Sequence, residues 1–281
     1  MKINLPLSRF FYALIFLMLF SSCGKDDDAQ PVVEQGPVCL PVKITRVKTC
    51  NMPSVDTLVY NSKNLLSEII KIANNGDTSY INFSYDSQNR LNERVERRKS
   101  SQYKSEYFYT NNKPTEVKYF NITNGTSFSG KSLLKYDQNG KVNDIENYDK
   151  NNNLISDLID VTYDSEGQII VLETFDPPTS RAFKVKVSYD DKKYVFARYN
   201  DALSVLFEVY SELNKVHPVL HNVLSFEHAV KEDSTYKVYY KIDNSFTYNN
   251  KGYPIEMISE IDDVSANTKS TETTYFEYNC F

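Results

Sequence analysis

The chain has 281 residues, 41% of them hydrophobic and 25% charged, so it is long enough for a sizeable core and is not disordered in composition. The formal net charge of −5 argues against nucleic acid as a partner, because phosphate binding needs a concentrated basic face. The single basic cluster, Arg94 to Lys99, is interleaved with Glu93 and Glu96 and is typical of a solvated strand face.

Residues 1–22 have the layout of a secretory signal peptide: Lys2 and Arg9, an apolar run from Phe10 to Phe20, and small residues before Cys23. The run of eleven apolar residues is too short to span a bilayer, which takes about 20. The string FSSC resembles a bacterial lipobox. This resemblance implies cleavage before Cys23 and lipidation of its thiol and new amine, which would anchor the protein to a membrane without a spanning segment.

Residues 23–38 are predicted to be the lipidated cysteine followed by a flexible acidic linker. Lys25, Asp26 and Asp27 resemble the export signal that follows the lipidated cysteine in surface lipoproteins of Bacteroidota. The resemblance implies an outer-membrane protein that is exposed on the cell surface. A plain soluble spacer is the alternative.

Three cysteines remain after Cys23: Cys39, Cys50 and Cys280. Outside the cytoplasm one disulfide is expected, and three pairings are open. We favour Cys39 with Cys280, which would join the two ends of the fold.

A repeat organises residues 39–281, which we interpret as one domain. Eight tyrosines recur at spacings of 25, 24, 27, 27, 26, 59 and 30 residues: Tyr60, Tyr85, Tyr109, Tyr136, Tyr163, Tyr189, Tyr248 and Tyr278. A sustained period in this range indicates a repeat architecture. The gap of 59 is about two units and suggests that one copy has been replaced.

Each unit predicts two strands and two turns. The stretch 183–189, FKVKVSY, alternates apolar and polar residues up to its tyrosine, which indicates a half-buried strand. Asp or Asn then follows, and Gly140, Gly167 and Gly252 supply the positive φ of a turn. The units after Tyr60, Tyr85, Tyr109 and Tyr189 lack this glycine, so their register is the least defined.

The unit Y-D-x-x-G-x-[LIV] resembles the YD-type repeats of Rhs-like proteins. The whole layout is similar to uncharacterised Bacteroidota lipoproteins with a porin-like β fold. The resemblance implies an all-β fold, an antiparallel meander of hairpins that forms a large curved sheet or a soluble barrel. It implies no activity. Because the second strand face carries Lys, Glu, Asn and Ser, a transmembrane barrel with an outward apolar band is not expected.

One segment breaks the pattern, an insertion at about 199–220. Residues 201–213 have helical apolar spacing behind Asn200, a good N-cap, and predict an amphipathic helix that packs against the apolar side of the sheet.

No catalytic or metal motif stands out. His217, His221 and His228 lie near the insertion, but Pro218 disfavours a helix at His217 and no HExxH pattern is present. We therefore expect no cofactor, no metal and no enzymatic activity. Asp56-Thr57-Leu58 and Asp233-Ser234-Thr235 resemble the O-glycosylation sequon of Bacteroidota.

We weigh three functions and favour the first. The first is a non-enzymatic binding or scaffold module whose partner is a polysaccharide or an outer-membrane protein. The second is a surface glycan hydrolase, which would need two carboxylates at catalytic separation, one with a raised pKa. The third is a purely structural envelope protein.

Overall fold

The computed structural model describes residues 39–48, 52–192, 194 and 221–280. These residues form sixteen strands, listed in chain order: β1 Cys39–Lys48, β2 Ser54–Tyr60, β3 Leu66–Ile72, β4 Thr78–Tyr85, β5 Leu91–Arg97, β6 Gln102–Thr110, β7 Lys113–Asn121, β8 Ser127–Tyr136, β9 Val142–Asp149, β10 Leu154–Tyr163, β11 Ile169–Asp176, β12 Arg181–Tyr189, β13 Val223–Glu232, β14 Thr235–Tyr248, β15 Pro254–Asp263 and β16 Thr268–Cys280.

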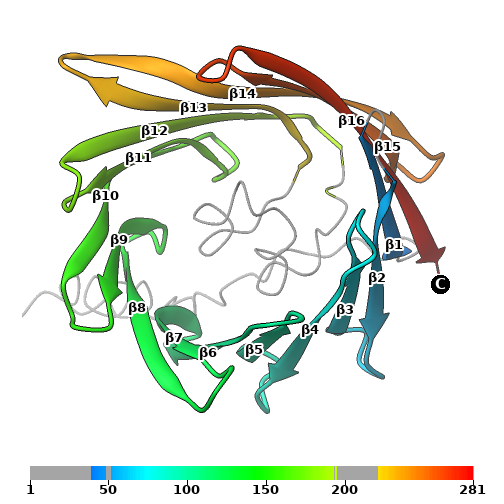
Figure 1. The fold of residues 1–281 in the computed structure, drawn as a ribbon, viewed down its shortest axis with the longest axis horizontal. Coiled ribbons are helices and arrows are strands. Elements are labelled where there is room, and N and C mark those ends of the chain that lie inside the picture. The colour runs from blue at the N-terminus through cyan, green and yellow to red at the C-terminus, as the bar shows by residue number, and fades with distance from the viewer. Residues whose placement is uncertain (1–38, 49–51, 193, 195–220, 281) are drawn as a thin grey trace, which may run out of the picture. The chain divides into compact units, whose positions relative to one another are not determined.

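The strands form one closed antiparallel barrel in which each strand pairs with its neighbours in the chain. Figure 1 shows the first and last strands, β1 and β16, side by side. Their register runs from Cys39 opposite Cys280 to Lys48 opposite Glu272. The expectation of an all-β antiparallel meander is confirmed, and the sheet is closed. The helix predicted at 201–213 lies outside the described residues, and the described residues contain no helix.

One hairpin is present between Tyr189 and Tyr248, and the segment inferred to replace a repeat, about 199–220, lies outside the described residues. Tyr189 ends β12 and Tyr248 ends β14, and β12 pairs directly with β13, so the hairpin between them is present. Every even-numbered strand from β2 to β16 ends on or near a repeat tyrosine. The spacing of 59 residues therefore comes from a long insertion within one turn.

Asparagine takes the place of glycine in two of the turns that lack it, those after Tyr60 and Tyr85. Gly140, Gly167 and Gly252 have φ values of 78°, 86° and 79° at the fourth position after their tyrosines. Asn64 and Asn89 hold the same position with φ values of 59° and 61°. Asparagine tolerates this left-handed conformation better than other non-glycine residues, so the register continues through these units.

The two faces of the sheet differ in chemistry. One face carries most of the buried side chains, and the other carries exposed Lys, Glu and Asp. Because side chains crowd together on the concave side of a closed sheet, the buried face is the inner wall. One apolar cluster on this wall spans β9 to β14 and consists of Val142, Ile145, Ile169, Leu172, Val187, Phe226 and Ile242.

Candidate functional site: the tyrosine rim and the interrupted turn

One end of the barrel, here called the tyrosine rim, is where the even-numbered strands end and the next odd-numbered strands begin. At seven of the eight repeat tyrosines the hydroxyl donates to a backbone carbonyl at or near the start of the preceding odd-numbered strand. The distances run from 2.5 to 2.8 Å for Tyr60 to Pro41, Tyr85 to Leu66, Tyr109 to Leu91, Tyr136 to Pro114, Tyr163 to Val142, Tyr189 to Ile169 and Tyr278 to Pro254. The tyrosines thus tie neighbouring units together around the rim.

The turns of the rim are closed by the acid or amide that follows the tyrosine. In a regular unit the Asp86 Oδ1 atom accepts from the backbone N–H groups of Gln88 and Arg90 at 2.8 and 2.9 Å. The Asp86 N–H also donates to the Arg90 carbonyl at 2.9 Å. Asn61, Asp137, Asp164 and Asn249 close their turns in the same way.

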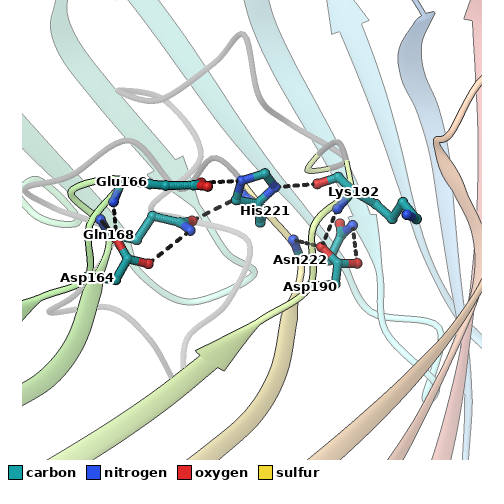
Figure 2. Close-up of polar contacts among 7 residues, drawn as sticks. All are labelled: Asp164, Glu166, Gln168, Asp190, Lys192, His221 and Asn222. Carbon is teal, nitrogen blue, oxygen red and sulfur yellow. Dashed lines mark hydrogen bonds and ion pairs between the residues drawn. The ribbon is translucent and has the colours of Figure 1, made fainter.

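The turn after Tyr189 has the same hydrogen bonds, as Figure 2 shows, although the insertion separates its residues in the sequence. Asp190 Oδ1 accepts from the N–H of Lys192 and from that of Asn222, both at 3.0 Å, and the Asp190 N–H donates to the Asn222 carbonyl at 3.0 Å. Asn222 thus stands where Arg90 stands in the regular turn, although it follows Tyr189 by 33 residues instead of five. We call this the interrupted turn.

The remaining repeat tyrosine, Tyr248, makes a different hydrogen bond, which stabilises the interrupted turn. The Tyr248 hydroxyl donates to Asp190 Oδ2, which also accepts from the Asn222 side-chain amide at 3.0 Å. The carbonyl of Val223, which a regular tyrosine would reach, accepts instead from the Asn244 amide at 2.9 Å. Burial and then the hydrogen bond to Asp190 raise the pKa of Tyr248.

His221 links the interrupted turn to the turn between β10 and β11 (Figure 2). Its Nε2 atom lies 2.7 Å from Glu166 Oε2, and its Nδ1 atom lies 2.8 Å from the Lys192 carbonyl oxygen. Its backbone N–H donates to Gln168 Oε1 at 3.2 Å, and Gln168 is only 3% exposed.

The inner wall also carries buried polar groups. Arg46 pairs with Asp56 at 2.9 Å, and Asp56 is only 2% exposed. Glu96 is held between Arg94 at 2.7 Å and Arg98 at 2.5 Å. Burial tends to raise the pKa of Glu96, but the arginines outweigh burial and lower it.

A chain of neutral groups continues this polar layer from β7 to β10. The Tyr119 hydroxyl lies 2.9 Å from Ser132 Oγ, Ser132 Oγ donates to Asn147 Oδ1, and the Asn147 amide donates to Ser156 Oγ at 2.6 Å. Hydroxyls, amides and a tyrosine ring are groups that bind polar, uncharged molecules such as sugars.

Acidic groups interact with one another on the outer wall. Asp157 on β10 lies near Asp144 on β9, and burial, followed by the interaction with Asp144, raises the pKa of Asp157. Asp144 Oδ1 is buried and has no hydrogen-bond partner, whereas Asp144 Oδ2 pairs with Lys135 at 2.6 Å.

The remaining predicted residues are placed as follows. Cys39 and Cys280 are joined by a disulfide at the tyrosine rim, between β1 and β16. His228 stacks on Phe183 with ring centroids 5.7 Å apart. It lies opposite Val185 in the pairing of β12 with β13, away from the contacts of His221. Cys23, Lys25, Asp26, Asp27, Cys50 and His217 lie outside the described residues.

Sequence reasoning missed the contacts of Asp190, Asn222 and Tyr248. A signal was present, because Tyr189-Asp190 begins a regular unit and no turn glycine or asparagine follows at the fourth position. The sequence could not indicate that Asn222, 32 positions after Asp190, completes the turn.

Comparisons with known proteins support the fold alone. The chain is similar to a porin-like protein from Bacteroides uniformis ATCC 8492, with 10% identity, 85% of this chain and 96% of that chain covered, and a TM-score of 0.56. A porin-like protein from Bacteroides vulgatus ATCC 8482 is 11% identical, with 86% and 99% covered and a TM-score of 0.42. No family model and no curated protein matches the sequence. Among the described residues, no helix is long and apolar enough to cross a membrane. The fold is thus that of a porin-like β-barrel.

Proposed function

We propose that the chain is a lipid-anchored protein of the outer membrane, exposed on the cell surface, that acts as a non-enzymatic binding or scaffold module. In this proposal Cys23 carries the lipid, Lys25, Asp26 and Asp27 direct export, and the barrel lies in water. The partner is a polysaccharide or another outer-membrane protein.

The observation that carries the proposal is the charge on the outer wall. Five ion pairs join residues directly opposite each other on adjacent strands, at 2.6 to 3.3 Å: Lys43–Glu277, Lys135–Asp144, Lys184–Glu173, Lys186–Glu227 and Lys269–Asp262. They lie on the strand pairs β8–β9, β11–β12, β12–β13, β15–β16 and β1–β16. A Lys facing lipid costs up to about 2–4 kcal/mol, so this wall suits water.

The attachment point of the linker supports a tether. β1 begins at Cys39, 16 residues after Cys23, and this strand end belongs to the tyrosine rim. A flexible linker of this length has a root-mean-square span of about 20–25 Å. Such a linker would hold the barrel near the membrane surface while leaving its walls accessible.

The inner polar wall supports a glycan as the ligand in this proposal. Its neutral hydroxyls and amides between Tyr119 and Ser156, together with the paired Arg94 and Glu96, favour a polar and largely uncharged molecule such as a glycan. We infer no catalysis there, because Asp56 and Glu96 on this wall are paired with arginines.

Protease treatment of intact cells, with the protein followed by antibody, tests the location. Loss of the protein without lysis is expected. Survival until the outer membrane is opened would contradict surface exposure. Purified protein is then tested on a glycan array, where Asn147→Ala is expected to weaken binding at least tenfold while the outer-wall variant Glu277→Gln leaves it unchanged.

A second function, hydrolysis of glycans, is favoured by one observation only. Asp157 has a raised pKa beside Asp144, as a general acid would need. Incubation of the purified protein with envelope glycans tests it. Product release that Asp157→Asn abolishes would support hydrolysis, and no release would leave the binding module as the function.

A further inference from the structure

We propose that doubly protonated His221 is a proton-dependent latch that ties the interrupted turn to the turn between β10 and β11. The proposal concerns a conformational device of the rim and is independent of the lipid anchor and of any ligand.

The geometry of the ring requires two protons. Nδ1 faces the Lys192 carbonyl oxygen at 2.8 Å and Nε2 faces a Glu166 carboxylate oxygen at 2.7 Å. Both partners are acceptors, and a neutral imidazole has only one N–H to donate. Only the imidazolium form can donate to both partners, so the contacts seen in Figure 2 belong to the charged ring.

The charges around the ring favour this form. The β10–β11 turn contributes Asp164 and Glu166, and the segment after β12 contributes Asp190, Asp191 and Lys192. Burial opposes the charge, but the Lys192 carbonyl and then Glu166 outweigh burial and raise the pKa of His221 above its ordinary 6.5.

The position of the ring determines which elements the latch connects. His221 immediately precedes Asn222 in the sequence. Asn222 bonds to Asp190 in the interrupted turn as Arg90 bonds to Asp86 in a regular turn. The ring therefore connects the turn before β11, the end of β12 and the start of β13. The other bonds of the interrupted turn involve groups that do not change charge near neutral pH, namely backbone amides, the Asn222 side chain and the Tyr248 hydroxyl.

The direction of the pH effect follows from linkage. Because the pKa of His221 is raised in the folded state, the stabilisation is fully present below about pH 6.5 and is lost as the pH rises through the folded-state pKa. Above it the ring has one N–H for two acceptors, and either the Glu166 or the Lys192 contact is lost.

The test combines NMR titration of the three histidines in the full folded protein with amide hydrogen exchange. His221→Gln assigns the resonance by its disappearance. We expect the pKa of His221 to exceed 6.5 and to fall to about 6.5 or below in Glu166→Gln, since the charge partner is then neutral. Exchange at residues 164–168 and 190–192, corrected for the intrinsic rate, should accelerate several-fold between pH 6 and 9.

Two variants distinguish the latch from a general effect of pH. In Glu166→Gln the acceleration should be largely lost, and in Glu227→Gln, which removes an outer-wall partner of Lys186, it should persist unchanged. A native His221 pKa at or below 6.5 would overturn the proposal. An unchanged pH dependence in Glu166→Gln would overturn it as well.

Discussion

A single hydroxyl group distinguishes the repeat tyrosines from ordinary core aromatics. The rings of Tyr136, Tyr163 and Tyr189 pack against the apolar cluster. In seven units the hydroxyl reaches a carbonyl of the neighbouring unit. Phenylalanine would fill the same space but would leave this carbonyl without its partner. Burial raises the pKa of Tyr163 to about 12, so the hydroxyl remains a donor at neutral pH.

Replacing Tyr85 with Phe tests this role. The change removes the 2.8 Å bond to the Leu66 carbonyl, and Leu66 is fully buried, so the free energy of unfolding should fall by about 1–2 kcal/mol. Urea denaturation measures it as a lower midpoint at an unchanged slope. Tyr80→Phe, on the exposed outer wall, is the matched control and should cost less than about 0.5 kcal/mol. Equal costs for the two variants would contradict the account.

Turns connect the strands at both ends, and the backbones of β8 and β9 come close together at one end of their ladder. Gly130 on β8 has φ 152°, and a Cβ atom there would lie 2.3 Å from the Tyr148 carbonyl oxygen on β9. Glycine is needed here because the obstacle is backbone and cannot rotate away.

Gly130→Ala should therefore destabilise the barrel by about 1–3 kcal/mol, because β8 and β9 must separate locally to admit the methyl group. Thermal unfolding followed by circular dichroism measures the loss. Ser129→Ala, at the exposed neighbouring position, is expected to leave the midpoint within about 1 °C. A stable Gly130→Ala variant would show that the strands separate at no cost.

Many of the strands and turns were predictable from the sequence. The tyrosine period and the alternation in stretches such as 183–189 indicate hairpins, and Gly140 and Gly167 mark turns that the structure contains. Asn64 and Asn89 escaped notice because asparagine adopts positive φ only when its surroundings require it. The interrupted turn was unpredictable, since Asp190 and Asn222 meet only after the whole barrel aligns β12 with β13.

Closure of the barrel is a property of the whole molecule that local patterns do not contain. The first and last strands, β1 and β16, pair along a seam, and the Cys39–Cys280 disulfide lies at the end of this seam. The two cysteines are 241 residues apart in the sequence. A cross-link over so long a loop restricts the unfolded chain strongly.

Loss of the disulfide should lower the free energy of unfolding by about 2–5 kcal/mol. The double variant Cys39→Ser and Cys280→Ser, compared with the native protein in urea, measures this change. Reductant should destabilise the native protein and leave the double variant unaffected. If reduction of the Cys39–Cys280 bond left the free energy of unfolding of the native protein unchanged, the prediction would be contradicted.

The proposed function requires a lipid on Cys23 to be the only attachment of the barrel to the membrane. This requirement is tested by replacing residues 1–22 with a cleavable secretory signal of the non-lipoprotein type and Cys23 with Ser, and then fractionating cells without detergent. The account predicts that the variant is soluble while the native chain sediments with membranes. A variant that stays in the membrane fraction until detergent is added would show that the barrel itself is inserted.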